Sequence, residues 1–193
     1  NIYVEAVHTD GVRTSQSNMV QVYTQMSRLP DYVNADYATM GSTHGIDVSF
    51  TVDPLSDLTH YILQRSDNPS GPYTAIDEIH TTSKHISYTD NVPFTSGIRF
   101  YRLETVNNCG TGSIQSNLAN NIILNGSFND NYVNLSWNDY FDWAGGVESY
   151  RVIRTRGRAN PVVDTLNNAP LTEFSESLTG MIDYADPQSS YLC

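Results

Sequence analysis

The chain has 193 residues, and its 10 Lys and Arg residues against 21 Asp and Glu residues give a formal net charge of −11 at pH 7. Nucleic acid is therefore not an expected partner, because phosphate contacts need a basic surface. The 39% of hydrophobic residues supports packed cores, while no apolar run approaches the roughly 18 residues of a membrane span, so membrane insertion is not expected either.

Short segments in which apolar and polar residues alternate recur along the chain between clusters of Gly, Pro, Asn and Asp. This alternation is typical of half-buried strands, whereas an apolar stripe with the helical period nowhere persists over three turns. The sequence therefore predicts an all-β fold. In the central part of the chain the expected strands are 33–40, 45–53, 59–66, 73–80, 85–90, 98–108 and 113–123.

The chain contains an internal repeat of about 97 residues. Segment 4–18 aligns with segment 103–117 without a gap, at an offset of 99 residues, and both segments end in Gln-Ser-Asn. A second set of similar segments links the middle of the chain to its last third: 45–50 with 132–137, 60–66 with 149–155, and 86–91 with 182–187. We therefore expect the same structural unit three times, with only the central copy whole.

The central copy, residues 27–124, contains seven expected strands separated by turn residues, which is typical of an immunoglobulin-like β-sandwich. Residues 1–26 correspond to the last two strands of a first module of this kind. Residues 125–193 correspond to the first five strands, and the start of the sixth, of a third module. We expect the two incomplete modules to be completed either by covalent neighbours or by strands donated from another chain.

Aromatic and acidic residues gather in the expected loop between the second and third strands of the last module: Tyr140, Asp142, Trp143 and Glu148. In a sandwich of this kind the loop lies at the tip that faces the preceding domain. We interpret the aromatic side chains as packing the loop and joining the two domains. The same residue types suit two alternatives, a sugar site with ring stacking and a calcium site with carboxylate ligands.

The chain has two cysteines, Cys109 and Cys193, too few for a disulfide-stapled domain or a four-ligand zinc module. The repeat places them at opposite tips of their modules, so a bond between them within one chain would exceed the Cα separation of about 7 Å that a disulfide allows. Two free thiols are one prediction. A disulfide across a joint between modules, or between two chains, is the other.

The sequence lacks the residue patterns of catalytic sites. No Gly-x-Ser-x-Gly motif occurs, and Gly110-Thr-Gly112 lacks the helix that follows a phosphate-binding loop. The five histidines are scattered; His80 and His85 flank one turn, but no third metal ligand is recognisable beside them. We expect no catalytic residues, no metal site and no cofactor, with calcium at the aromatic loop as the alternative.

Longer stretches of the sequence resemble a known family. The resemblance is carried by residues 135–155, which begin LSWNDYFDW, by residues 61–79, and by residues 100–117 with their Cys-Gly hairpin. These stretches are similar to the tandem fibronectin-III-like repeats of large bacterial surface proteins that end in a gliding-motility-associated sorting domain and leave the cell by the type IX system. The resemblance covers essentially the whole chain, although the sorting domain itself is not recognisable here. It implies an extracellular location and no catalytic residues.

We therefore predict a non-catalytic structural or adhesive array segment at the bacterial cell surface, in which sandwiches are stacked end to end. The expected partners are neighbouring modules or copies of the chain itself, and beyond them a glycan or another cell-surface protein. The alternative is a carbohydrate-binding accessory module of a secreted enzyme, centred on Tyr140, Asp142 and Trp143.

Overall fold

The computed structural model describes residues 1–22, 27–41, 45–93, 97–107, 109–110, 112–154, 162–166 and 171–177, and of Ser113 and residues 162–166 it describes the backbone alone. These residues form fifteen strands and no helix. A helix long and apolar enough to cross a membrane is therefore not found among them. The prediction of an all-β fold is confirmed.

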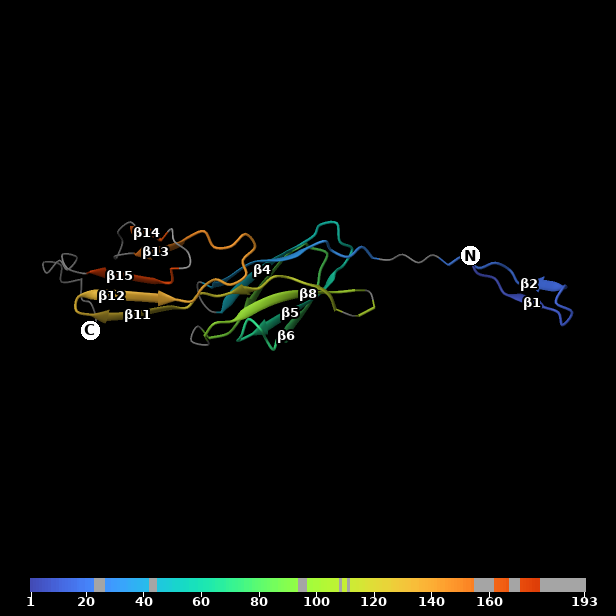
Figure 1. The fold of residues 1–193 in the computed structure, drawn as a ribbon, viewed down its shortest axis with the longest axis horizontal. Helices are drawn as coiled ribbons and strands as arrows, with labels where there is room; N and C mark the ends of the chain where they lie inside the picture. The colour runs from blue at the N-terminus through green and yellow to red at the C-terminus, as the bar shows by residue number, and fades with distance from the viewer. Residues whose placement is uncertain are drawn as a thin grey trace.

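The central part of the chain folds as a sandwich of two antiparallel sheets (Figure 1). One sheet has the strand order β3-β4-β7, and the other has the order β10-β8-β5-β6 with β9 also paired to β8. The strands are β3 (Val33–Met40), β4 (Ile46–Val52), β5 (His60–Ser66), β6 (Thr74–His80), β7 (His85–Asp90), β8 (Phe100–Val106), β9 (Gly112–Gln115) and β10 (Ala119–Asn120). The fourth strand pairs with the third and not with the fifth, which is the fibronectin-III-like arrangement of the sandwich.

The alternation of residues along the strands explains the core of the sandwich. Ile46, Val48, Phe50 and Val52 of β4 share one face of their sheet, and none of them is more than 1% exposed. Strands β5 and β8 supply the opposite layer, with Tyr61, Leu63, Tyr101 and Leu103 fully buried. Burial of one such side chain stabilises the folded state by about 1.5–3 kcal/mol, so this two-layer core stabilises the domain.

Six of the seven expected central strands form within two residues of their predicted bounds. The last one, expected as 113–123, is instead interrupted and forms β9 and β10. At the interruption the side chain of Asn117 reaches β3 in the other sheet, where it accepts a hydrogen bond from the Ala35 N–H (2.8 Å) and donates one to the Ala35 carbonyl (3.4 Å). The prediction of one continuous strand was therefore wrong, because a side chain there replaces a backbone partner.

The last part of the described chain forms two smaller sheets. They contain β11 (Leu124–Asn129), β12 (Tyr132–Trp137) and β15 (Glu173–Ser177) in the order β11-β12-β15, and β13 (Tyr150–Arg154) paired with β14 (Val162–Leu166). Tyr150 and Val152 stand at the positions of Tyr61 and Leu63, yet they are only half-buried, whereas the central pair has no exposed surface. Among the described strands, none pairs with β13 on the side where β8 pairs with β5.

Residues 1–22 form a separate hairpin of β1 (Glu5–Val7) and β2 (Thr14–Gln16), lengthened by a bridge between Ile2 and Val20. The Val4 N–H donates to Ser17 Oγ (2.9 Å), just as the Leu103 N–H donates to Ser116 Oγ (3.0 Å). The same offset of 99 residues relates the following contacts: Ser17 N–H to Val4 O with Ser116 N–H to Leu103 O, Gly11 N–H to His8 O with Gly110 N–H to Asn107 O, and the pair Glu5–Gln16 with the pair Glu104–Gln115. The hairpin thus shares these contacts with the last strands of the central sandwich, and it differs next to the turn, where Val7 is opposite Thr14 but Val106 is opposite Gly112.

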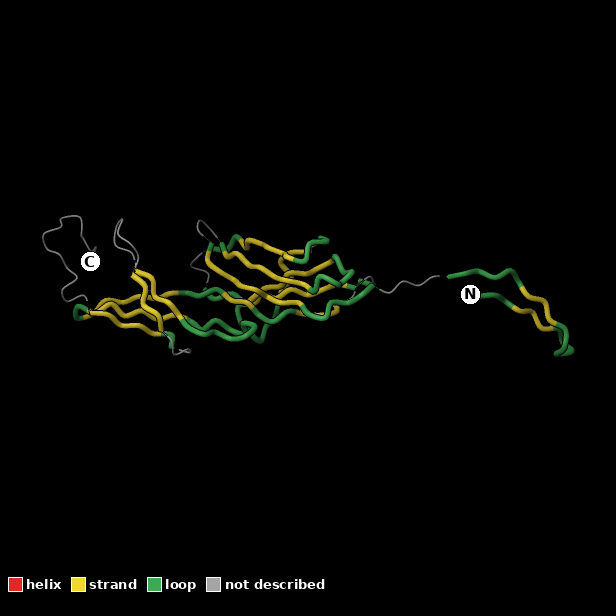
Figure 2. The backbone as a smooth tube through the Cα atoms, turned by 90° about the horizontal axis from the view of Figure 1, so that it is seen from above, coloured by secondary structure: helices red, strands yellow, loops and turns green. Residues whose placement is uncertain are grey.

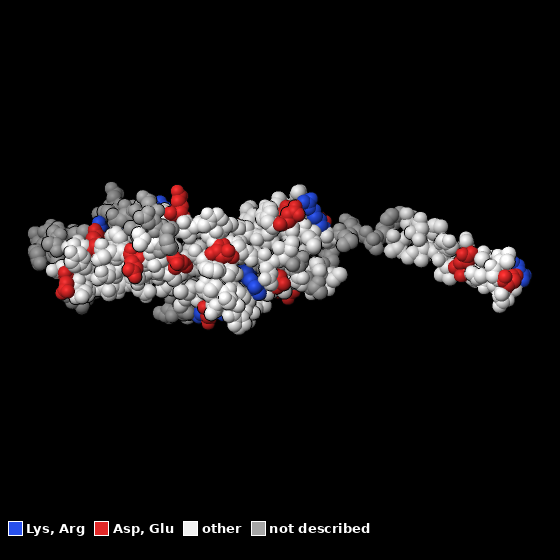
Figure 3. Space-filling model, viewed as in Figure 1, with Lys and Arg blue, Asp and Glu red and all other residues white. Residues whose placement is uncertain are grey.

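The three units follow one another along the long axis of the molecule, with the hairpin at one end (Figures 1 and 2). Among the described residues, the backbone hydrogen bonds of 1–22 stay within the hairpin. On the face shown in Figure 3, acidic side chains are spaced along the central and last units, and basic side chains stand singly or beside them.

Asp53 fastens the segment that leads into β3 to the loop that follows β4. Its carboxylate accepts hydrogen bonds from the backbone N–H groups of Asp31 (3.0 Å) and Leu55 (2.9 Å). Both bonds favour the ionised form and hold the pKa of Asp53 below its ordinary value of 3.8. The stability that Asp53 supplies is therefore present at neutral pH and is lost as the pH falls through the lowered pKa.

We predict that Asp53→Asn lowers the melting temperature at neutral pH and makes the further decrease between about pH 6 and pH 3 smaller than in the wild type, because the amide does not titrate. Calorimetry of both proteins over this pH range measures the difference. Asp31→Asn is the control, since its carboxylate is exposed and the backbone N–H that donates to Asp53 is kept; we expect a smaller decrease of the melting temperature at neutral pH than in Asp53→Asn. An equal pH dependence of the wild type and Asp53→Asn contradicts this role of Asp53.

Candidate functional site

The loop from Asn138 to Ser149, between β12 and β13, contains the residues that the sequence singles out as a binding site. The corresponding loop of the central sandwich, Asp53 to Thr59, is shorter and contains no aromatic residue. The longer loop turns through left-handed backbone at Asp142 (φ 57°) and at the glycine pair that follows (φ 89° and 80°), where the absence of Cβ removes the steric cost. It therefore folds back on itself and presents its aromatic side chains to the preceding unit.

Two aromatic side chains of this loop bind the edge of β3, the outer strand of its sheet. The Trp143 indole N–H donates to the carbonyl oxygen of Asp36 (2.7 Å), and the Ala38 N–H donates to the Tyr140 hydroxyl oxygen (2.9 Å). Tyr140 also packs against the hydrophobic core of the central sandwich. Burial raises the pKa of its hydroxyl, so the group stays neutral where it accepts the hydrogen bond from the Ala38 N–H of β3.

Asparagine side chains connect the backbones on the two sides of this contact, which we call the joint. Asn120 is fully buried; it accepts a hydrogen bond from the Phe141 N–H (2.6 Å) and donates one to the Asp139 carbonyl (3.1 Å). Asn138 accepts from the Ile123 N–H (2.8 Å) and donates to the carbonyl of Asn121 (3.1 Å). Because each amide is satisfied at both its oxygen and its nitrogen, these side chains fix the orientation of the segments that they connect.

Asp142 and Phe141 complete the joint. The Asp142 carboxylate accepts a hydrogen bond from the Leu118 N–H (3.1 Å), and its carbonyl accepts one from the Asn117 side chain (2.9 Å). The Phe141 ring meets Phe100 edge to face, with 6.3 Å between the ring centroids. These contacts agree with the interpretation that the loop residues pack the loop and join the two units. They restrain rotation of the last unit against the central sandwich.

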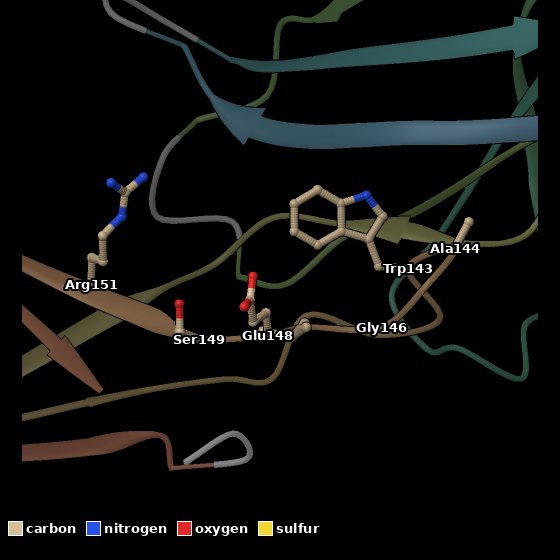
Figure 4. Close-up of a pocket in the computed structure, with 7 residues that line it drawn as sticks. Trp143, Ala144, Gly146, Glu148, Ser149 and Arg151 are labelled. Carbon is tan, nitrogen blue, oxygen red and sulfur yellow. The ribbon is translucent and has the colours of Figure 1, made fainter. Parts of the chain in front are cut away.

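Trp143 is 42% exposed and borders an open hollow on the last unit (Figure 4). The residues that line this Trp143 hollow are Trp143, Ala144, Gly146, Val147, Glu148, Ser149 and Arg151. In Figure 4 the side chains of Glu148, Ser149 and Arg151 extend to the same side of the chain, with Glu148 nearest the indole ring and Arg151 farthest from it. An aromatic face next to a carboxylate, a hydroxyl and a guanidinium can stack on a sugar ring and hydrogen-bond to its hydroxyl groups.

The structure therefore separates the four loop residues that the sequence groups together. Trp143 and Glu148 line the hollow, whereas Tyr140 and Asp142 do not line it and, like the Trp143 indole, make hydrogen bonds in the joint. Sequence analysis does not single out the asparagines of the joint, although three of them cluster just before the last module, Asn117, Asn120 and Asn121, and Asn138 follows β12. It also passes over Ser149, which looks like an ordinary residue at the start of a strand, and it marks Arg151 only as the first of four arginines within residues 151–158.

The other expected sites have the following positions. Within the described residues, the carboxylates of the loop do not form a group of three potential metal ligands, and calcium binding there stays a prediction. Cys109 is exposed in the turn between β8 and β9. Cys193 lies outside the described residues, so a disulfide across a joint or between chains also stays a prediction.

Comparison with protein-family models gives no match, and comparison with curated proteins gives none either. Among solved structures, the chain is similar to an Fn3-like protein from Clostridium thermocellum, with 25% identity and a TM-score of 0.39 over 48% of this chain and 91% of that one. It is also similar to the FN1–FN3 domains of chicken CNTN1, with 13% identity and a TM-score of 0.36 over 89% of this chain and 63% of that one. A third similar structure is a β-1,2-glucanase from Parabacteroides distasonis, with 11% identity and a TM-score of 0.34 over 55% of this chain and 15% of that one. The fibronectin-III-like fold itself follows from the strand order of the central sandwich.

We predict that Tyr140→Phe loosens the joint, because the Ala38 N–H loses its acceptor while the aromatic ring is kept. A buried amide left without a partner costs about 1–3 kcal/mol, so hydrogen exchange at Ala38 accelerates about tenfold or more. Exchange of the individual amides, followed by NMR, measures the change.

Tyr132→Phe is the matched control, since it removes an exposed hydroxyl from the same unit. We expect wild-type exchange at Ala38 in this variant. Unchanged exchange in Tyr140→Phe would show that the hydroxyl does not hold the joint.

Proposed function

We propose that the chain is a non-catalytic segment of an extracellular structural or adhesive array, of the kind found in the large bacterial surface proteins that its sequence resembles. In this proposal its fibronectin-III-like modules are stacked end to end, and the hairpin of one copy completes the last module of a neighbouring copy. The observation that carries the proposal is the match between the hydrogen bonds of residues 1–22 and those of the last strands of the central sandwich.

The match identifies the face of the hairpin that would become buried. Ile2, Val4 and Val20 stand at the positions of Tyr101, Leu103 and Ala119, which are all fully buried in the central sandwich. In the hairpin the same positions are 61%, 71% and 53% exposed. A two-stranded hairpin with its apolar face in water is marginally stable by itself, so this face favours a partner sheet.

The last unit offers the complementary surface. Its first five strands correspond to those of the central sandwich, and the inward side chains Tyr150 and Val152 are only half-buried among the described residues. Trp137, which meets Tyr150 with ring centroids 5.6 Å apart, has a buried indole nitrogen without a hydrogen-bond partner. Addition of two strands beside β13 would cover Tyr150 and Val152, as the pairing of β8 with β5 does for Tyr61 and Leu63 in the central sandwich.

The joint favours an array in which each module has a defined orientation relative to the next. Hydrogen bonds on both sides of Asn120 and Asn138, together with the contacts of Tyr140 and Trp143, orient the last unit against the central one. A chain of modules held in this way acts as a spacer of defined length, in contrast to modules on flexible linkers.

We predict that the full chain associates head to tail with increasing concentration, and that Val4→Arg prevents this association. Position 4 corresponds to the fully buried Leu103, so a charged side chain there cannot enter a partner core without a large desolvation penalty. Sedimentation velocity over a range of concentrations measures the association.

Tyr3→Arg is the matched control, because the corresponding position of the central sandwich is Arg102, which that module accommodates. It should associate as the wild type does. A wild-type chain that stays monomeric at every concentration, or equal loss of association in both variants, contradicts strand donation between copies.

A second candidate function, a carbohydrate-binding module, is favoured by the Trp143 hollow alone. We predict that a glycan array detects a ligand and that Glu148→Ala weakens its binding about tenfold or more, since a hydrogen bond to a charged group contributes about 1.5–3 kcal/mol. Asp139→Ala is the control, because this carboxylate is in the same loop but not in the hollow. Absence of any bound glycan, or equal effects of both variants, excludes this function.

A further inference from the structure

Two histidines and a glutamate meet on the outer face of the central sandwich. His60 of β5 lies directly opposite His80 of β6 in the antiparallel pairing of these strands. Glu78 precedes His80 by two residues on the same strand, so its side chain is on the same face of the sheet. The inward neighbour of His60, Tyr61, is fully buried, which places the three polar side chains on the side of the sheet away from the core.

The distances within this cluster are those of groups that can share one ion. Glu78 Oε1 lies 2.6 Å from His60 Nε2 and 3.4 Å from His80 Nε2. One ligand atom of each residue lies within 4.8 Å of the others, and the two imidazole rings stack with centroids 4.2 Å apart. His60 Nε2 is buried and, despite its short distance to Glu78, makes no hydrogen bond of acceptable geometry. A polar atom in this position is available as a ligand.

The sandwich does not need these side chains in order to form. In the last unit the pairing of β13 with β14 repeats that of β5 with β6, with Tyr150 opposite Leu166 as Tyr61 is opposite Ile79. The residue at the position of His60 is Ser149 there, and the residue at the position of Glu78 is Thr165. Since the same strands pair without an imidazole or a carboxylate at these positions, the cluster is a feature of the central module alone.

We propose that His60, Glu78 and His80 bind a divalent transition-metal ion of the zinc class. Two imidazole nitrogens and one carboxylate oxygen form a donor set that suits Zn²⁺, and it differs from the all-oxygen set that Ca²⁺ and Mg²⁺ prefer. Three protein ligands leave one position of a tetrahedral site for water or for a side chain of a partner. The site lies on β6, the outer strand of its sheet, where a partner can reach it.

Titration of the full chain with Zn²⁺ by isothermal calorimetry tests the proposal. The expected result is saturation at one ion per chain, with no comparable uptake of Ca²⁺. His80→Ala and Glu78→Gln change side chains that are 65% and 62% exposed, so both variants keep the fold. Each should weaken binding by more than about tenfold, because even loss of a hydrogen-bonding partner behind a metal ligand costs about 10–100-fold in affinity.

His85→Ala is the matched control. It removes an exposed imidazole from β7, in the other sheet, where His85 contacts Thr51. We expect zinc affinity as in the wild type, and NMR signals of the His60 and His80 rings that move on zinc addition while those of His85 do not. Absence of saturable zinc binding, or an effect of His85→Ala equal to that of His80→Ala, would overturn the proposal and leave an ion pair between histidine and glutamate.

Discussion

The outer edge of β3 is the constraint on which the arrangement of the central and last units depends. A strand edge carries backbone N–H and carbonyl groups that need partners, and an open edge invites pairing with other chains. Here side chains supply those partners: the Asn117 amide for Ala35, the Trp143 indole for Asp36 and the Tyr140 hydroxyl for Ala38. Because two of these three side chains come from the last unit, the edge is satisfied only when that unit is docked.

The same requirement for partners governs the two ends of the described chain. The hairpin of residues 1–22 pairs its two strands with each other but has an uncovered apolar face at Val4 and its neighbours. The last unit has paired strands but a half-covered interior around Tyr150. The two ends are complementary in kind, since the hairpin has no sheet to pack on, and the described strands of the last unit include no partner of β13 like the β8 partner of β5.

The outward positions of the sandwich are where chemistry other than packing can be added. Position 60 is a histidine in the central module, and position 149, its counterpart in the last unit, is a serine, although both strands pair in the same way. The loop after the second strand likewise differs: the central module has a short one anchored by Asp53, and the last unit has a long one that carries Trp143. In the proposed array, variable loops and outward faces would thus place different contacts at different modules.

The sequence by itself determined the strands and the order in which they occur, because the alternation that buries Ile46, Val48 and Phe50 is a local property with a period of two residues. It also related segment 4–18 to segment 103–117 through their common residues. Only the tertiary structure decided which distant side chains meet. His80 and His85 flank one turn in the sequence, yet strand register places His80 against His60. Register, and the part of a side chain such as Trp143 that stays uncovered, depend on contacts between residues far apart in the chain, which periodicity does not encode.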